Sequence, residues 1–264
     1  MKIHYRLTTK CLEVCRIVGL RNRSKFNLEI KRHGSQYGGW FAQVNSYEPH
    51  IIVTGGVGED ISFEVEVSSI QPDCLFVFID PTSRALTHFQ KTLLRSGMSA
   101  ELDYSSDGEQ DVRSYNLKYF KEQRVFFINK ALWKDCAGLM LERPKQSEHV
   151  SFKKPSSTST DIEWFESTDL PTVLNNLNTW APRWKSQKTI LKMDIEGSEL
   201  VVLNSFLQGK WRPYQLLVEF DILRNGSLKA VIDWLLTLLR LRLQRYRIVN
   251  SEGFNVTFMR IKNR

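Results

Sequence analysis

The stretch LKMDIEGSEL, residues 191–200, decides the fold class. A short apolar run ends at Asp194 and Glu196, and Gly197 and a third acid, Glu199, follow at once. Charge that leaves water needs a partner or a chemical task. We therefore expect a buried strand that ends in an acidic turn and continues into a helix.

The chain around this stretch repeats the same alternation of strand and helix patterns from residue 50 onward. Short β-branched runs separated by helical periodicity are typical of a parallel sheet with crossover helices, so the predicted fold class is α/β and Rossmann-like. The predicted strands are 50–54, 74–80, 124–129, 189–194, 215–221, 245–250 and 255–261, and the predicted helices are 60–70, 83–96, 169–180, 198–208 and 227–242. Only SEGF joins the last two strands, so we expect one of them to run antiparallel at the edge of a seven-stranded sheet.

The net charge divides the chain into two parts. The chain has 264 residues and a formal net charge of +8, and residues 1–33 hold nine Lys or Arg against two Glu, a net +7. We expect residues 1–45 to form a basic arm or cap and residues 46–264 to form one large domain. The arm lacks the interleaved aromatic residues of a single-strand nucleic-acid surface, so a solvated cap is the favoured interpretation.

Other features of the sequence exclude several classes of protein. No apolar segment approaches the length of a transmembrane helix, and the first twenty residues carry charges where a signal peptide has an apolar core. We therefore expect a cytoplasmic protein. The four cysteines form no zinc-binding pattern. The polar stretches 97–118 and 144–160 are predicted to be loops or insertions.

Glycines and an acid mark the ends of the first two predicted strands, where an open parallel sheet binds ligands. The first strand runs into TGGVGED, and the second ends in Asp80, 22 residues after Gly58. Glycines let the backbone approach a ligand, and an acid at this distance can hold the two hydroxyls of a ribose. A dinucleotide fingerprint would need glycine at Ile61. The pattern therefore favours a nucleotide-type ligand other than NAD.

The order of these motifs resembles one enzyme family. VTGGVGEDISFE, FIDPT, ILKMDIEGSELVVL and LLVEFD follow one another as in the FkbM-type S-adenosylmethionine-dependent methyltransferases, over roughly residues 46–261. The family hallmark, Lys-hydrophobic-Asp-hydrophobic-Glu-Gly-x-Glu, is matched from Lys192 to Glu199. Two positions depart from the broader methyltransferase pattern: Thr54 stands in place of an acid, and Asp60 in place of a third glycine. The resemblance implies a class I methyltransferase fold and S-adenosylmethionine as cofactor.

The resemblance also implies which residues form the site. The cofactor-binding residues expected from it are Thr54, Gly56, Gly58, Glu59, Asp80, Asn129, Ala131 and Leu132. In this fold the fourth strand ends beside the transferred methyl group, so Asp194 and Glu196 are the expected catalytic residues. They are two positions apart and would share one side of an extended strand.

The chemistry of the two acids leaves alternatives open. One carboxylate can act as the general base that takes the proton of a hydroxyl acceptor, while the other orients the acceptor. Clustered carboxylates also suit a divalent cation, although no metal is expected here. For Asp194 the alternative is a carboxylate that caps backbone amides, and for Glu199 the favoured role is stabilisation of the following helix start. Glu219 is either a substrate contact or a salt-bridged core acid.

Three functions remain possible from the sequence. The favoured one is O-methylation of a small-molecule or glycan hydroxyl. The second is RNA methylation guided by the basic arm, but the Asn/Asp-Pro-Pro-aromatic signature of amino-group methylation is absent, since the fourth strand continues as MDIEG. The third is a module that binds the cofactor without catalysis.

Overall fold

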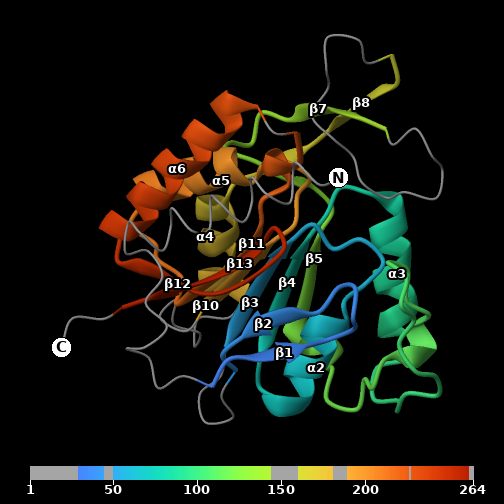
Figure 1. Ribbon diagram of the computed structural model, residues 1–264. Helices are drawn as coiled ribbons and strands as arrows, with labels where there is room; N and C mark the ends of the chain where they lie inside the picture. Colours follow the sequence, from blue (N-terminus) through green and yellow to red (C-terminus); the bar gives the residue numbers. More distant parts are fainter. Residues whose placement is uncertain (1–28, 45–49, 144–159, 181–188, 226, 262–264) are drawn as a thin grey trace.

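A computed structural model describes residues 29–44, 50–143, 160–180, 189–225 and 227–261. Its centre is a seven-stranded sheet in the order β12-β13-β11-β10-β3-β4-β5 (Figure 1). The strands are β3 (Ile51–Gly55), β4 (Leu75–Ile79), β5 (Val125–Ile128), β10 (Thr189–Met193), β11 (Gln215–Glu219), β12 (Tyr246–Glu252) and β13 (Asn255–Arg260). These are the seven predicted strands, with ends shifted by at most two residues.

Strand direction confirms most of the predicted topology and corrects one detail. All neighbours from β11 to β5 are parallel, whereas β13 is antiparallel to both β11 and β12. The antiparallel strand is therefore second from the edge, and the prediction that it forms the edge was wrong. The helix between β11 and β12 places β12 one strand position beyond the place next to β11, which leaves a gap between the two strands. The turn at Gly253, with φ of 57°, then reverses the chain, and β13 fills this gap antiparallel to both neighbours.

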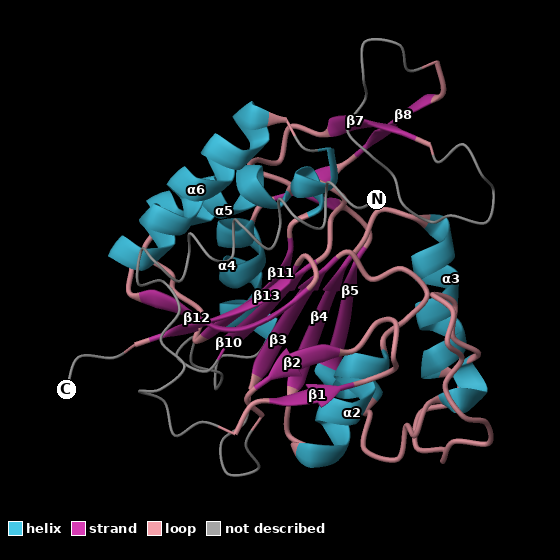
Figure 2. Cartoon of the chain, viewed as in Figure 1, coloured by secondary structure: helices cyan, strands magenta, loops and turns pink. Residues whose placement is uncertain are grey.

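Helices cover both faces of the sheet (Figure 2). One face carries α2 (Ser62–Ile70) and α3 (Ser83–Leu93), and the other carries α4 (Leu170–Trp180), α5 (Glu199–Gln208) and α6 (Leu228–Leu243). The predicted helices are confirmed within three residues at each end. Each face has its own core of β-branched, leucine and aromatic side chains, because strands buried on both sides must present apolar residues in both directions.

The described part of the basic arm packs onto the large domain. Residues 31–42 form a hairpin of β1 (Lys31–His33) and β2 (Trp40–Ala42), and Trp40 is buried. Gln215 Nε2 donates to Gln43 O at 2.7 Å, and Thr257 Oγ1 donates to Phe41 O at 2.6 Å. Residues 29–44 thus act as a cap that is continuous with the sheet domain. The first 28 residues, with most of the predicted arm, lie outside the described residues.

Several short elements that the sequence pattern did not predict lie between the strands and helices of the main fold. β6 (Ala131–Leu132) pairs in parallel with β9 (Ser167–Thr168), and β7 (Leu139–Glu142) pairs with β8 (Ile162–Phe165). Short 3-10 helices are η2 (Val112–Ser114), η3 (Glu122–Arg124) and η5 (Asp221–Asn225). The predicted loop 97–118 is otherwise irregular, and nearly all of the predicted loop 144–160 lies outside the described residues. No helix in the described ranges is both long and apolar enough to cross a membrane.

Candidate functional site

A cavity of about 910 Å³ lies beyond the carboxyl ends of the central strands. Its wall combines the loops after β3, β4, β10 and β11 with the β1–β2 turn and the segment around β6 and β7. Eight of the ten predicted site residues line it: Gly56, Gly58, Glu59, Asp80, Ala131, Leu132, Asp194 and Glu196. The other two, Thr54 and Asn129, do not. The volume is within the usual range for a small-molecule or cofactor site.

The glycine loop after β3 is shaped by backbone geometry. Gly56 has φ of 76°, and a Cβ at this position would lie 1.7 Å from the carbonyl oxygen of Asp194. Gly58 has φ of 58° and open space around its missing Cβ. Left-handed backbone favours glycine, and the contact at Gly56 excludes any side chain. The loop therefore lies directly against the end of β10.

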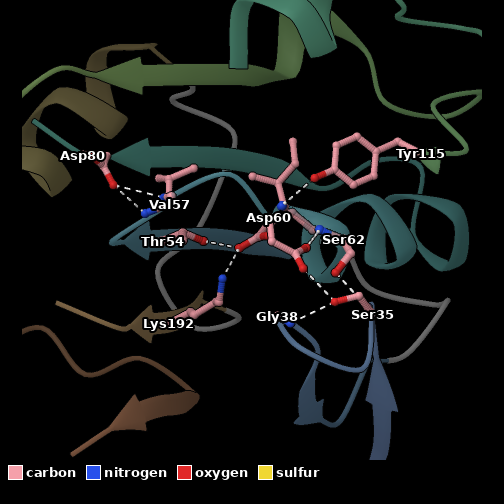
Figure 3. A network of polar contacts seen from close by, with 12 residues as sticks. Ser35, Gly38, Thr54, Val57, Asp60, Ser62, Asp80, Tyr115 and Lys192 are labelled. Carbon is pink, nitrogen blue, oxygen red and sulfur yellow. Dashed lines mark hydrogen bonds and ion pairs between the residues drawn. The ribbon is translucent and has the colours of Figure 1, made fainter. Parts of the chain in front are cut away.

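Asp80 holds this loop in place. Its Oδ2 accepts hydrogen bonds from Val57 N at 2.8 Å and Gly58 N at 3.2 Å (Figure 3), and its Oδ1 accepts from Thr82 N at 2.8 Å and Thr82 Oγ1 at 2.6 Å. The side chain is buried but reaches the cavity wall. Asp80 thus joins the glycine loop to the start of α3, a role in positioning that the sequence pattern did not indicate.

Thr54 and Asn129 make their contacts outside the cavity. Thr54 is buried and donates to Glu64 Oε1 at 2.6 Å, and Lys192 Nζ lies 3.3 Å from the same oxygen (Figure 3). The exposed Asn129 has its amide group 3.2 Å from the carbonyl oxygens of Asp80 and Pro81. Neither side chain lines the cavity: Thr54 is buried behind its wall, and Asn129 lies at the surface beside the loop after β4. Lys192 does line it, although the sequence pattern did not single out this residue for the site.

Four carboxylates gather at the ends of β10 and β11. One oxygen each of Asp194, Glu196 and Asp221 lies within 4.8 Å of the others, and Glu219 lines the same cavity. Arg224 forms ion pairs with both Glu219 and Asp221. Glu219 is therefore a salt-bridged acid, as one of the two alternatives had it, and it also lines the cavity; its contact with a substrate stays a prediction. The geometry also suits a hard divalent cation, with Arg224 already supplying positive charge.

Burial, together with neighbouring negative charge, raises the pKa values of three of these acids, Asp194, Glu219 and Asp221. Burial, followed by the charges of Glu219 and Glu196, raises the pKa of Asp194 well above its ordinary value. Burial and the nearby Glu196 charge raise the pKa of Asp221 to about 7, and burial also raises the pKa of Glu219. Like charges that are removed from water disfavour simultaneous ionisation. Asp194, Glu219 and Asp221 therefore hold protons more strongly than isolated carboxylates do.

The route by which Glu196 reaches the cavity differs from the prediction. β10 ends at Met193, and Glu196 and Gly197 have φ of 54° and 91°, so the strand does not continue through the two acids. A turn brings Glu196 to the cavity instead. Glu199 shapes this turn, because its Oε1 accepts from Gly197 N at 2.9 Å and from Ile195 N at 3.3 Å. Its contacts fit the structural role expected at the start of α5, and burial raises its pKa to about 8.

The N-terminal hairpin contributes a residue that sequence reasoning missed. Ser35 Oγ donates to Asp60 Oδ2 at 2.7 Å and accepts from Gly38 N at 2.8 Å, which ties the hairpin turn to the loop after β3 (Figure 3). Tyr37 lies in this turn, lines the cavity, and packs its ring against Gly108. Burial and the charge of Asp194 raise its pKa. The only sequence signal was the turn itself, SQYGG.

The contacts of Asp60 explain why an acid stands where the broader methyltransferase pattern has a third glycine. Its Oδ1 accepts from Ser62 N at 2.9 Å while its Oδ2 holds Ser35, and a Cβ at Gly38 would lie 2.5 Å from its Cγ. The adjacent Ile61 N donates to Tyr115 Oη at 3.1 Å (Figure 3). The carboxylate of Asp60 thus binds both the first residue of α2 and the N-terminal cap, which a glycine at this position could not do.

The chain matches no known protein-family model. A search of curated proteins also found no match.

Proposed function

We propose that the protein is an S-adenosylmethionine-dependent methyltransferase of the FkbM type that methylates a hydroxyl of a small molecule or glycan. The observation that carries this proposal is the meeting of the glycine loop and the acid cluster at the boundary between β3 and β10. The chain proceeds from β3 through β4 to β5 in one direction and from β10 in the other. Such a switch point is where open α/β sheets bind ligands.

The residues at the switch point fit the proposed cofactor. Gly58 leaves open space at the cavity, Asp80 and Glu59 present carboxylates, and Ala131 and Leu132 form an apolar wall. Together with Gly56, these residues would hold the cofactor, while Thr54 and Asn129 support them. When bound, the cofactor supplies a methyl group already activated by a sulfonium. Asp80 keeps the loop in place by accepting four hydrogen bonds, two at each carboxylate oxygen, so a ribose hydroxyl would have to share or replace one of these bonds.

The acids at the other end of the cavity supply the chemistry that the chain itself must perform. Asp194 takes the proton from the acceptor hydroxyl, and Glu196 and Glu219 orient that hydroxyl. A base works best when its pKa approaches the working pH, and the burial and neighbouring charges around Asp194 move its pKa in that direction. With that proton held by Asp194, the hydroxyl oxygen would be free to bond to the methyl group that a bound cofactor supplies, and the cofactor would leave as its neutral thioether.

Charge at the cavity supports an uncharged or cationic acceptor. Asp194, Glu196 and Glu219 gather at one end of the cavity, where Arg224 pairs with Glu219, and this concentration of carboxylates disfavours a phosphodiester at that end. Lys192 and Arg143 line other parts of the cavity, so the support for a small-molecule or glycan hydroxyl over RNA comes from the acidic end alone. RNA methylation and binding without turnover remain the alternative functions, with a test for each below.

Two measurements test the proposed function. Calorimetry should detect binding of S-adenosylmethionine and of its demethylated product but not of NAD. Incubation with cofactor and a metabolite or oligosaccharide mixture should then yield a product heavier by one methyl group, about 14 Da. Binding of NAD alone would overturn the proposal, and methylation of RNA but not of hydroxyl compounds would select the second function. Binding without transfer to any acceptor would select the third.

A further inference from the structure

Helix α6 carries a second apolar face that points away from the core. Leu228, Ile232, Leu236, Leu239 and Leu243 are exposed by 76%, 47%, 46%, 43% and 81%. At 100° per residue these five side chains fall within about 80° of the helix circumference. The buried side chains Trp234, Leu238 and Leu241 lie on the opposite side. α6 also lies on the outside of the layer that it forms with α4 and α5 (Figure 1).

This stripe is too regular to be scattered surface hydrophobicity. Its members follow one another at spacings of 4, 4, 3 and 4 residues over about 22 Å of helix. Single exposed leucines are ordinary on a protein surface, but a contiguous aliphatic patch marks a contact site. The last four residues have the alternating spacing of 4 and 3 by which one helix packs along another. The stripe is therefore shaped for a helical partner.

We infer that α6 docks antiparallel against α6 of a second copy of this chain, about a two-fold axis that passes between Leu236 and Thr237. With this axis the apolar side chains of the two helices interleave along the stripe. Symmetry makes the contact self-complementary, because each contact between two different residues occurs twice, once on either side of the axis.

Charge on one flank of the stripe supports this pairing. Asp233 and Arg240 lie on the same flank and are equally far from the proposed axis. Asp233 of one copy therefore faces Arg240 of the partner subunit, and the reverse pair forms at the same time. Arg240 is held at the surface by a hydrogen bond from its Nη1 to Asn204 Oδ1 at 2.6 Å. α6 has three basic residues against one acid, so its net charge would also suit an anionic membrane; the symmetric placement of Asp233 and Arg240 about the axis is what favours a second copy.

The inferred contact is independent of the proposed function. None of the five stripe residues lines the cavity, although Arg224, which does, precedes α6 by only a few residues. Dimerisation would leave the cavity open in both copies. Dimerisation through α6 therefore does not depend on the proposed cofactor or reaction.

Sedimentation equilibrium of the full chain from about 1 to 100 μM tests the inference. The parent protein should dimerise, and Leu236→Glu and Leu239→Glu should be monomeric at 100 μM, because each places a buried charge at the centre of the contact. Leu94→Glu is the matched control: Leu94 is 82% exposed but lies at the end of α3. It should dimerise like the parent. A parent that stays monomeric at 100 μM, or a Leu236→Glu variant that still dimerises, overturns the inference.

A charge exchange tests the direction of the two helices. Asp233→Arg or Arg240→Asp alone places like charges opposite each other and should weaken dimerisation by about tenfold, since each pair occurs twice. The double variant restores opposite charges and should recover most of the loss. Equal weakening in the double variant would overturn the antiparallel arrangement. Binding of the monomer to vesicles of anionic phospholipid, blocked by Leu236→Glu, would show that the stripe meets a membrane instead.

Discussion

The carbonyl oxygen of Asp194 occupies the place that a Cβ of Gly56 would need, with only 1.7 Å between them. The residue that follows β10 and the residue that follows β3 in the glycine loop are therefore in direct backbone contact. This contact couples the proposed catalytic acid to the loop that would hold the cofactor.

Gly56→Ala should damage the site more than the same substitution does at another glycine with positive φ. The substitution combines an unfavourable φ with a clash against the backbone, so the loop must move away from β10. We expect a melting temperature lower by several degrees and cofactor affinity reduced by more than tenfold. Gly97→Ala is the control, because Gly97 has φ of 85° but nothing within 4 Å of its missing Cβ. Equal effects at both positions in thermal unfolding and calorimetry would refute the coupling.

Asp80→Ala should weaken binding and destabilise the fold together. Hydrogen bonds to a charged group contribute about 1.5 to 3 kcal/mol, so affinity should fall by about 10- to 100-fold. The melting temperature should fall as well, because the glycine loop loses two of its anchors. Thr82→Val removes one donor to Asp80 and also the hydrogen bond that Thr82 Oγ1 accepts from Ala85 N at the start of α3, so it should lower the melting temperature but reduce cofactor affinity less than Asp80→Ala does. Unchanged affinity in Asp80→Ala would remove this residue from the site.

Asp194→Asn and Glu196→Gln should fold and bind cofactor while losing turnover. The amides keep the shape of the acids but cannot accept a proton, and general-base catalysis contributes about 10²- to 10⁴-fold. We expect the larger loss at Asp194. Rate and melting temperature measured on the same proteins separate this role from a structural one, which would lower stability and leave the rate per folded molecule unchanged. A fully active Asp194→Asn would end the catalytic proposal for that residue.

Glu199 should make the protein less stable as the pH rises. Its pKa is about 8 in the folded chain against an ordinary value of 4.5, so the folded state binds more protons between these values. Folding stability should therefore be greatest near and below pH 4.5 for this group and decline up to about pH 8, by a few kcal/mol at most. Glu199→Gln should flatten the pH dependence of the melting temperature across this window. An unchanged pH profile would mean that Glu199 titrates near its ordinary value.

Chelation should leave the activity intact. Arg224 already pairs with two of the four acids, so a divalent cation is not needed to balance their charge. We expect the same rate with and without excess chelator in the assay that detects methyl transfer. Loss of activity that added Mg²⁺ restores would instead assign a metal to Asp194, Glu196 and Asp221.

The sequence alone determined the seven strands of the central sheet, the helices that cover it and eight of the residues that line the cavity. Strands such as Leu75–Ile79 and Thr189–Met193 are buried on both faces, so their apolar runs are visible in the chain, and acids or glycines at their ends are necessarily gathered at one edge of a parallel sheet. For this reason the pattern of residues along the chain was enough to place Asp80, Asp194 and Glu196 together.

The tertiary structure decided which of these side chains reach the cavity and what each one contacts. Thr54 points to Glu64 rather than to the cavity, Asp80 anchors a loop, and Tyr37 arrives from a hairpin more than 150 residues away from the acids it faces. Such contacts depend on how loops fold back after each strand, and φ values such as that of Glu196 follow from packing rather than from residue type. The local pattern of the sequence contains no information about these long-range contacts, so only the folded chain shows them.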